Sequence, residues 1–143
     1  REYGEHALHS AIAQRDPQAL LKWYDERDRE MSLDLYGSVA RGFVSNSPSD
    51  GINWITTIAH DELRGTTAAS FVENWLRRDS FRAGQAAIDL MNAFGPGPES
   101  DSIASQVVQH LASKNELESA SEWIANISNE SLRVSLMRDF GIR

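Results

Sequence analysis

Two histidines near the start of the chain come closest to the spacing of a reactive site. His6 and His9 lie three positions apart, on one face of a helix, with Glu2 and Glu5 beside them. Imidazole and carboxylate groups at this spacing could hold a metal ion such as zinc. The alternative, which we favour, is a pair of surface histidines near a frayed helix end. We therefore assign no metal ligand.

The motifs of catalysis are missing or incomplete elsewhere. The run Gly95-Pro96-Gly97-Pro98 lacks the lysine and the preceding strand of a phosphate-binding loop. No Gly-x-Ser-x-Gly elbow occurs, and no motif places a carboxylate in the apolar pocket that a general acid needs. The absence of cysteine excludes thiolate nucleophiles, thiolate metal sites and disulfides. We expect no catalytic residue, no cofactor and no intrinsic enzyme activity.

Aromatic and arginine side chains offer other candidate sites. The four tryptophans could form an aromatic ligand groove, but their recurrence favours core packing: Trp23, Trp54, Trp75 and Trp123. Arg64 and Arg133 each fall in the first turn of an expected helix, where a cation opposes the helix dipole. Each should therefore have a partner, which we expect to be a carbonyl at the end of the preceding helix pair. Ligand binding by these arginines is the alternative.

The elements that position these residues repeat along the chain. Five identities recur at the same offsets 69 residues apart. One copy reads Trp54, Ile55, Ile58, Leu63 and Arg64, and the other reads Trp123, Ile124, Ile127, Leu132 and Arg133. Expected helix starts divide this interval further, because they follow one another by 31, 32 and 37 residues: Asp16-Pro17, Ser47-Pro48, Asp79-Ser80 and Glu116-Leu117. Such a period predicts two helices per repeat and an α-solenoid.

A second set of apolar positions supports the same unit. Val39, Ala40, Phe43 and Val44 have the spacing of a buried helical stripe, and the same spacing recurs in the stripes that begin at Phe71 and Val107. The first copy would be Leu8, His9, Ile12 and Ala13, with Leu8 and Ile12 facing inward. No strand pattern competes. We predict nine helices, all-α, in a right-handed α-α superhelix of about four helix-turn-helix repeats plus a final helix.

The predicted repeats cover nearly the whole chain. They span approximately residues 3–31, 32–61, 62–99 and 100–129, and the final helix spans 130–143. We interpret residues 1–143 as a single α-solenoid domain, excised from a longer protein because it begins at Arg1 without methionine. The final helix is either a terminal cap or the start of a further repeat.

Capping residues predict where the helices begin. Asp16, Asp61 and Asn129 should accept first-turn amide hydrogens, and Asn115 with Glu118 has the pattern of a capping box. His60 is expected at the end of a helix, where a cation favours the C-terminal dipole. Two prolines should keep the Gly95–Ser100 segment an exposed loop that tolerates insertions, so the next helix should begin near Asp101.

Composition narrows the class of partner. The 143 residues are 41% hydrophobic and 24% charged, which is ordinary for a globular protein. The formal net charge of −7 argues against nucleic acid, because that binding needs a basic face. No apolar run approaches the length of a membrane helix. No targeting signal lies within residues 1–143, and the compartment stays unknown.

These features resemble the tetratricopeptide-like and HEAT-like superfamily of helical repeats. The tetratricopeptide pattern of Leu-Gly and Tyr, closed by Pro, does not recur, and the element from Trp123 to Arg133 looks more like divergent tandem repeats of large bacterial proteins. The resemblance implies a scaffold that binds other proteins, and it carries over no catalytic residue.

We therefore expect a protein-interaction scaffold whose partner is another polypeptide or another part of the parent protein. Polar residues of the first helix of each pair should line its binding face: Ser38, Arg41, Ser70, Asn74, Arg77, Gln106, Gln109 and Ser113. The alternatives are a metal-binding or enzyme module using His6, His9 and nearby carboxylates, and a HEAT-like reader of nucleic acid, which the charge disfavours.

Overall fold

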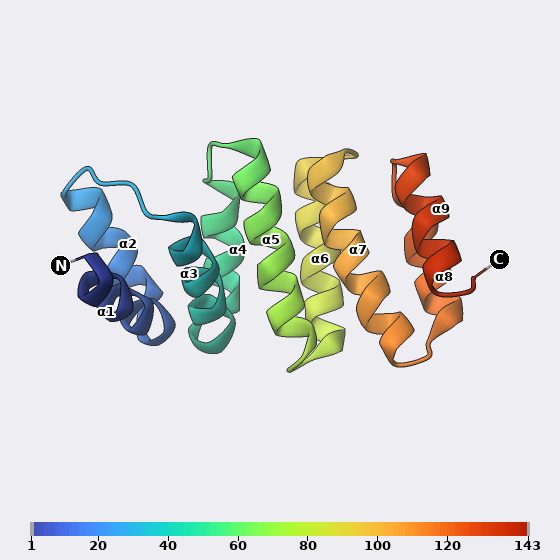
Figure 1. Ribbon diagram of the computed structural model, residues 1–143, viewed down its shortest axis with the longest axis horizontal. Coiled ribbons are helices and arrows are strands. Elements are labelled where there is room, and N and C mark those ends of the chain that lie inside the picture. Colours follow the sequence, from blue (N-terminus) through green and yellow to red (C-terminus); the bar gives the residue numbers. More distant parts are fainter. Residues whose placement is uncertain (1, 143) are drawn as a thin grey trace. The chain divides into compact units, whose positions relative to one another are not determined.

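The computed structural model describes residues 2–142, and it describes side chains from residue 4 onward. Within that range the chain forms nine α-helices and no strand (Figure 1). The helices are α1 (Glu2–Arg15), α2 (Pro17–Glu26), α3 (Leu33–Asn46), α4 (Pro48–Thr56), α5 (Asp61–Leu76), α6 (Ser80–Phe94), α7 (Pro98–Ser113), α8 (Leu117–Ala125) and α9 (Glu130–Asp139). The prediction of an all-helical chain is confirmed for this range.

The chain divides into two compact units, Arg1–Thr57 and Ile58–Arg143. The boundary falls inside the predicted 32–61 repeat. In the first unit, α1 packs on α3, and the pairs α1–α2 and α3–α4 are also in contact. Gly42 permits the close crossing of α1 and α3, because a Cβ atom at this position would overlap the carbonyl oxygen of Ala13.

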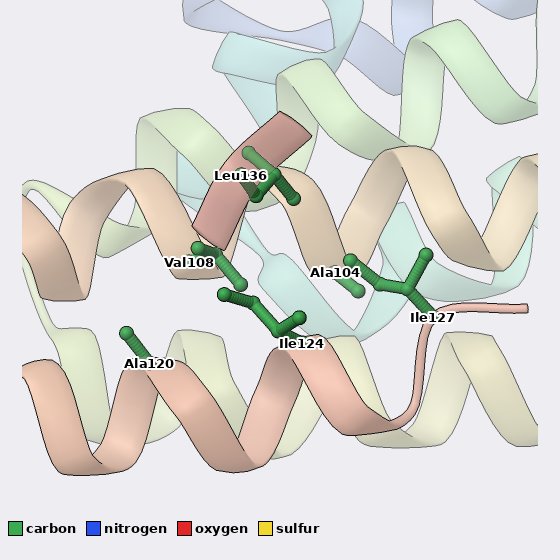
Figure 2. Packing of buried hydrophobic residues seen from close by; sticks show 6 residues of the cluster. All are labelled: Ala104, Val108, Ala120, Ile124, Ile127 and Leu136. Atoms are coloured by element: carbon green, nitrogen blue, oxygen red, sulfur yellow. The ribbon is translucent and has the colours of Figure 1, made fainter. Parts of the chain in front are cut away.

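In the second unit, α5 packs most extensively on α7, and the two lie side by side in Figure 1. Helices α6 and α8 each pack against α7, and α9 packs against α8. A hydrophobic cluster joins α7, α8 and α9 (Figure 2), and its buried members are Ala104, Val108, Ala120, Ile124, Ile127 and Leu136. The unit is thus built around α7, which contributes to both the α5 contact and this cluster.

Several predicted helix starts are present. The side chain of Asp16 accepts a hydrogen bond from the amide of Ala19, and the side chain of Asn129 accepts one from Leu132. Such bonds satisfy first-turn amides that have no partner within the helix.

Three other boundary predictions are wrong. His60, not Asp61, caps α5, because its Nδ1 accepts the amide hydrogen of Leu63 at 3.3 Å. His60 therefore lies at a helix start. Asn115 has a φ of +59° and follows the end of α7, so it terminates that helix and forms no capping box for α8.

The helix expected near Asp101 begins earlier, at Pro98. Proline at the first helical position loses no hydrogen bond and already has helical φ, so it starts α7 here and does not prolong the loop. The loop is therefore residues 95–97 only. Ser100 is buried, which removes the reason to expect that insertions next to it are tolerated.

The exposure of side chains in α1 contradicts part of the prediction that Leu8 and Ile12 face inward. Leu8 is 59% exposed and does not face inward, whereas His9 is 5% exposed. The interpretation of His6 and His9 as two surface histidines is therefore wrong for His9, and His6 is half-buried.

The tryptophans lie at the margin of the core. All four are half-buried, and the residue that follows each one is buried: Tyr24, Ile55, Leu76 and Ile124. The sequence predicted that the indole rings lie in the core, but the fully buried position is the residue that follows each tryptophan. Each ring covers the core edge and keeps part of its surface open to solvent.

Candidate binding groove

A hollow with a volume of about 630 Å³ lies in the second unit, between α6 and α8. Small-molecule and peptide side-chain pockets commonly have volumes of roughly 300–1,000 Å³. The hollow is an open groove, and its lining residues are Ile88, Met91, Asn92, Gly95, Pro96, Ser100, Glu122, Trp123 and Asn126.

The local fold explains why this groove forms. Helices α6 and α8 both pack on α7 and do not pack extensively on each other. The side of α6 that faces the core carries the small residues Ala83, Ala86 and Ala87, all buried. None of these alanines lines the groove, which lies instead at the end where α6 and α8 both terminate.

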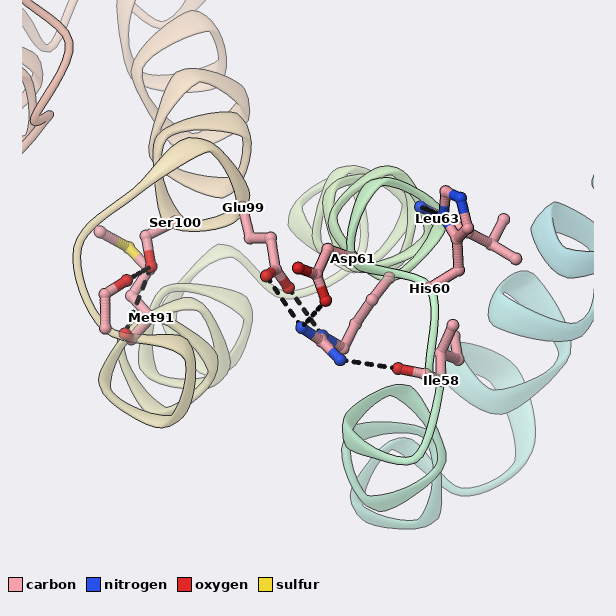
Figure 3. A network of polar contacts seen from close by, with 9 residues as sticks. Ile58, His60, Asp61, Leu63, Met91, Glu99 and Ser100 are labelled. Atoms are coloured by element: carbon pink, nitrogen blue, oxygen red, sulfur yellow. Dashed lines mark hydrogen bonds and ion pairs between the residues drawn. The ribbon is translucent and has the colours of Figure 1, made fainter.

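The loop between α6 and α7 closes one end of the groove. Gly95 has a φ of +75°, a conformation that glycine adopts without strain, and it ends α6. The hydroxyl of the buried Ser100 donates to the carbonyl oxygen of Gly95 at 2.6 Å and lies 3.3 Å from that of Met91 (Figure 3). This wall is held in place by hydrogen bonds to backbone atoms.

The lining combines apolar walls with a polar rim. Met91 and Trp123 are partly buried and pack against the α7–α8–α9 cluster, and Ile88 is 41% exposed. Glu122 and Asn126 lie on the α8 side, where the Asn126 side chain donates to the carbonyl oxygen of Glu122. Among the lining residues only Glu122 carries a charge, and no described cation forms an ion pair with it. The groove can thus bind an apolar group and a positive charge together.

Most of the predicted binding-face residues bond within their own helices. The guanidinium of Arg41 donates to the buried hydroxyl of Ser38, and Arg77 pairs with Glu73 at 3.2 Å. Asn74 donates to the carbonyl oxygen of Ser70, Gln109 donates to the hydroxyl of Ser105, and Ser113 donates to the carbonyl oxygen of His110. None of the predicted face residues, Gln106 included, lines a described hollow. Their role in binding stays a prediction.

The histidine region is organised around the buried ring of His9. Its Nδ1 lies 2.7 Å from the hydroxyl of Tyr24, and its ring meets Trp23 edge-on at 4.7 Å. Burial raises the pKa of Tyr24 above its ordinary value. One nitrogen of His9 is therefore engaged with a phenol, and Glu5 is engaged elsewhere.

Glu5 pairs with Arg29 at 3.0 Å, and this hydrogen bond holds the pKa of Glu5 below its ordinary value. The side chain of Glu2 lies outside the described residues. Across the described part of the chain, no group of three or more His, Asp or Glu residues has an arrangement that could hold a metal ion.

The two repeated arginines have the partners that the sequence predicted. Arg64 donates to the carbonyl oxygen of Ile58 at 2.8 Å (Figure 3), and Arg133 donates to that of Ile127 at 2.7 Å. Arg64 also donates twice to Glu99, at 2.7 and 3.0 Å. These bonds give both arginines a structural role. The arginine that recurs in the sequence therefore holds the segment before its helix in place.

The groove between α6 and α8 was not predicted. Its residues come from α6, α7, α8 and the segments that follow α6 and α8, and no local pattern in the sequence marks them as one site. No described helix has both the length and the apolar character needed to cross a membrane. Comparison with family models, curated proteins and solved structures gives no match.

Proposed function

We propose that this chain is a protein-interaction scaffold that binds a segment of another polypeptide, or of its parent protein, and catalyses no reaction. The observation that carries the proposal is the groove between α6 and α8. Its volume suits the side chains of a short peptide, and it combines the apolar surface and the few polar groups that ligand sites use.

The helical walls favour recognition through side chains. Helix backbone groups are bonded within each helix, so the walls offer no strand edge to which a peptide could add. Apolar contacts with Met91, Trp123 and Ile88 would supply most of the affinity, and the rim would orient the peptide. A small site of this kind binds weakly alone, and several such contacts add up in a longer array.

Selection from a random peptide library displayed on phage tests the proposal. We expect the folded 143-residue chain to enrich peptides that bind it directly when resynthesised. The matched control is Ile88→Lys, which places a positive charge on the groove wall at an exposed helix position. It should weaken the binding of the selected peptides and leave the circular dichroism spectrum unchanged.

Two results would contradict the proposal. One is a selection that enriches no peptide against the correctly folded chain. The other is stoichiometric zinc uptake, or turnover of a generic hydrolase substrate, that is lost in a variant combining His6→Ala with His9→Ala. A salt-dependent shift of DNA by the pure protein would favour the nucleic-acid reader instead.

A further inference from the structure

Trp123 differs from the other tryptophans in what lies against its ring. The other three rings are covered from within the chain: Trp23 by Arg27, Trp54 by Tyr36 and Phe43, and Trp75 by Phe71. Among the described residues, no aromatic ring or cation is paired with Trp123. Its ring instead lines the groove between α6 and α8.

Trp23 provides an internal example of what can cover such a ring. The guanidinium carbon of Arg27 lies 4.2 Å from the centre of the Trp23 ring, and that of Arg29 lies at 5.2 Å. A planar cation is attracted to the negative face of an indole ring, and arginine stacks on it well. Trp23 and Trp123 are both half-buried tryptophans of the second helix of a pair.

The electrostatics beside Trp123 also favour a cation. Glu122 lines the same groove without an ion-pair partner among the described residues, and the residue one helical turn before it is another acid, Glu118. Helices α6 and α8 both end here, at Phe94 and Ala125, and helix C-termini carry partial negative charge. The start of α7 brings an opposing positive end. Asp101 in its first turn partly offsets this charge, whereas Glu99 in the same turn is already paired with Arg64.

The apolar wall of the groove indicates what a ligand needs besides a cation. Ile88 and Met91 lie on the α6 wall, opposite the α8 residues that line the groove. A ligand that placed only a cation over Trp123 would leave this wall uncovered. An apolar side chain adjacent to the cation would cover it.

We propose that the groove binds a peptide segment in which an arginine is flanked by an apolar residue. The arginine stacks on Trp123 and pairs with Glu122, and the apolar residue packs on Ile88 and Met91. This inference rests on the proposed function and names the partner chemistry of the same groove. Arginine fits better than lysine because its planar group can stack on the ring and donate to the carboxylate at once.

Titration of the isotope-labelled full chain with capped Gly-Leu-Arg-Leu-Gly, followed by NMR, tests this chemistry. We expect the indole NH signal of Trp123 to shift, together with amide signals from the ends of α6 and α8. The same peptide with citrulline in place of arginine has the same shape but no charge, and it should bind about tenfold more weakly. Capped arginine alone should bind less well than the peptide.

Variants of the two acidic residues of α8 test whether Glu122 is the carboxylate that pairs with the arginine. Glu122→Gln should weaken the arginine peptide severalfold and bring its affinity close to that of the citrulline peptide. Glu118→Gln removes a neighbouring acid that does not line the groove and should change the affinity little. Glu122→Lys should reverse the preference towards a peptide with glutamate in place of arginine.

The outcomes separate this inference from the proposed function. Equal binding of the arginine and citrulline peptides, an unchanged affinity in Glu122→Gln, or no shift at about 10 mM peptide would overturn the arginine assignment. Peptides from the phage selection that bind without arginine, or that shift signals on other helices, would overturn it too, while leaving the scaffold proposal intact.

Discussion

Two segments related by the 69-residue interval enter helices in nearly the same way. Ile58–His60 leads into α5, and Ile127–Asn129 leads into α9. In each, the last residue caps the helix through its side chain, and an arginine in the first turn donates to the carbonyl oxygen of the isoleucine. The local sequence thus encodes one entry structure twice.

The two entry segments differ in how they are fastened to α7. The first is held through Arg64, whose guanidinium pairs with Glu99 of α7 and with Asp61 (Figure 3). The second is held directly by Asp101 of α7, which accepts bonds from the amide and hydroxyl of Ser128 and from the amide of Asn129, at 2.8–3.1 Å. Carboxylates two positions apart in one helical turn therefore hold two different segments.

The comparison shows that one local structure can be fixed by two kinds of interaction. Arg64 and Glu99 have side chains 20% and 19% exposed, so their ion pair is partly screened by water. Asp101 is 6% exposed and satisfies backbone amides that would otherwise lack a partner. We expect the Asp101 contacts to contribute more to stability.

The largest effect should come from Asp101→Ala. The substitution removes three hydrogen bonds to a buried carboxylate and leaves two amides without partners, which should lower the free energy of unfolding by about 3 kcal/mol. Urea unfolding followed by circular dichroism measures it. Asp101→Asn keeps the shape and some acceptor capacity, so it should cost less. A loss below about 1 kcal/mol in Asp101→Ala would remove the distinction between the two segments.

Arg64→Ala should have a smaller effect, about 1–2 kcal/mol, because it removes a carbonyl partner and leaves Glu99 unpaired. Arg133→Ala removes only carbonyl contacts and should cost less than Arg64→Ala. A double-mutant cycle sharpens the point: Arg64 and Glu99 should couple by about 1 kcal/mol, and Arg64 and Asp61 by about 0.3 kcal/mol, since Asp61 is 81% exposed. Equal losses in the two arginine variants would show that the ion pair contributes nothing.

Gly65→Ala tests the packing behind the same ion pair. A Cβ atom there would lie 3.2 Å from Cγ and 3.3 Å from Cα of Glu99, so α7 would have to shift. We expect a loss of about 0.5–1 kcal/mol despite the better helix propensity of alanine. Gly84→Ala is the control, because nothing lies within 4 Å of its added Cβ, and it should stabilise the chain. A gain in both variants would show that α7 adjusts freely.

Salt should produce the smallest effect. Raising sodium chloride to about 1 M shortens the screening length to roughly 3 Å, so the coupling between Arg64 and Glu99 should fall noticeably. The cost of Asp101→Asn should change little, because Asp101 is buried and its partners carry no charge. Repeating the urea titrations of these variants at low and high salt measures the difference. If salt changed the Arg64–Glu99 coupling and the cost of Asp101→Asn equally, the proposed difference between the two segments would be wrong.

The sequence by itself determined the features that depend on near neighbours. The helices follow from apolar periodicity, and several of their starts follow from caps within three residues of their targets, such as Asp16 and Asn129. The carbonyl partner of each repeated arginine could be predicted because it lies only six positions earlier. Local hydrogen bonds of this kind need no knowledge of the remaining chain.

Only the tertiary structure decided which residues meet across the fold. Asp101 lies 27 positions before Ser128, and no local pattern marks it as the acceptor of that segment. The burial of His9 beneath Tyr24 and the one-position displacement of the tryptophans depend on how neighbouring helices are rotated. The groove likewise exists because α6 and α8 each pack on α7, and the distance between two helices that share a neighbour is set by packing.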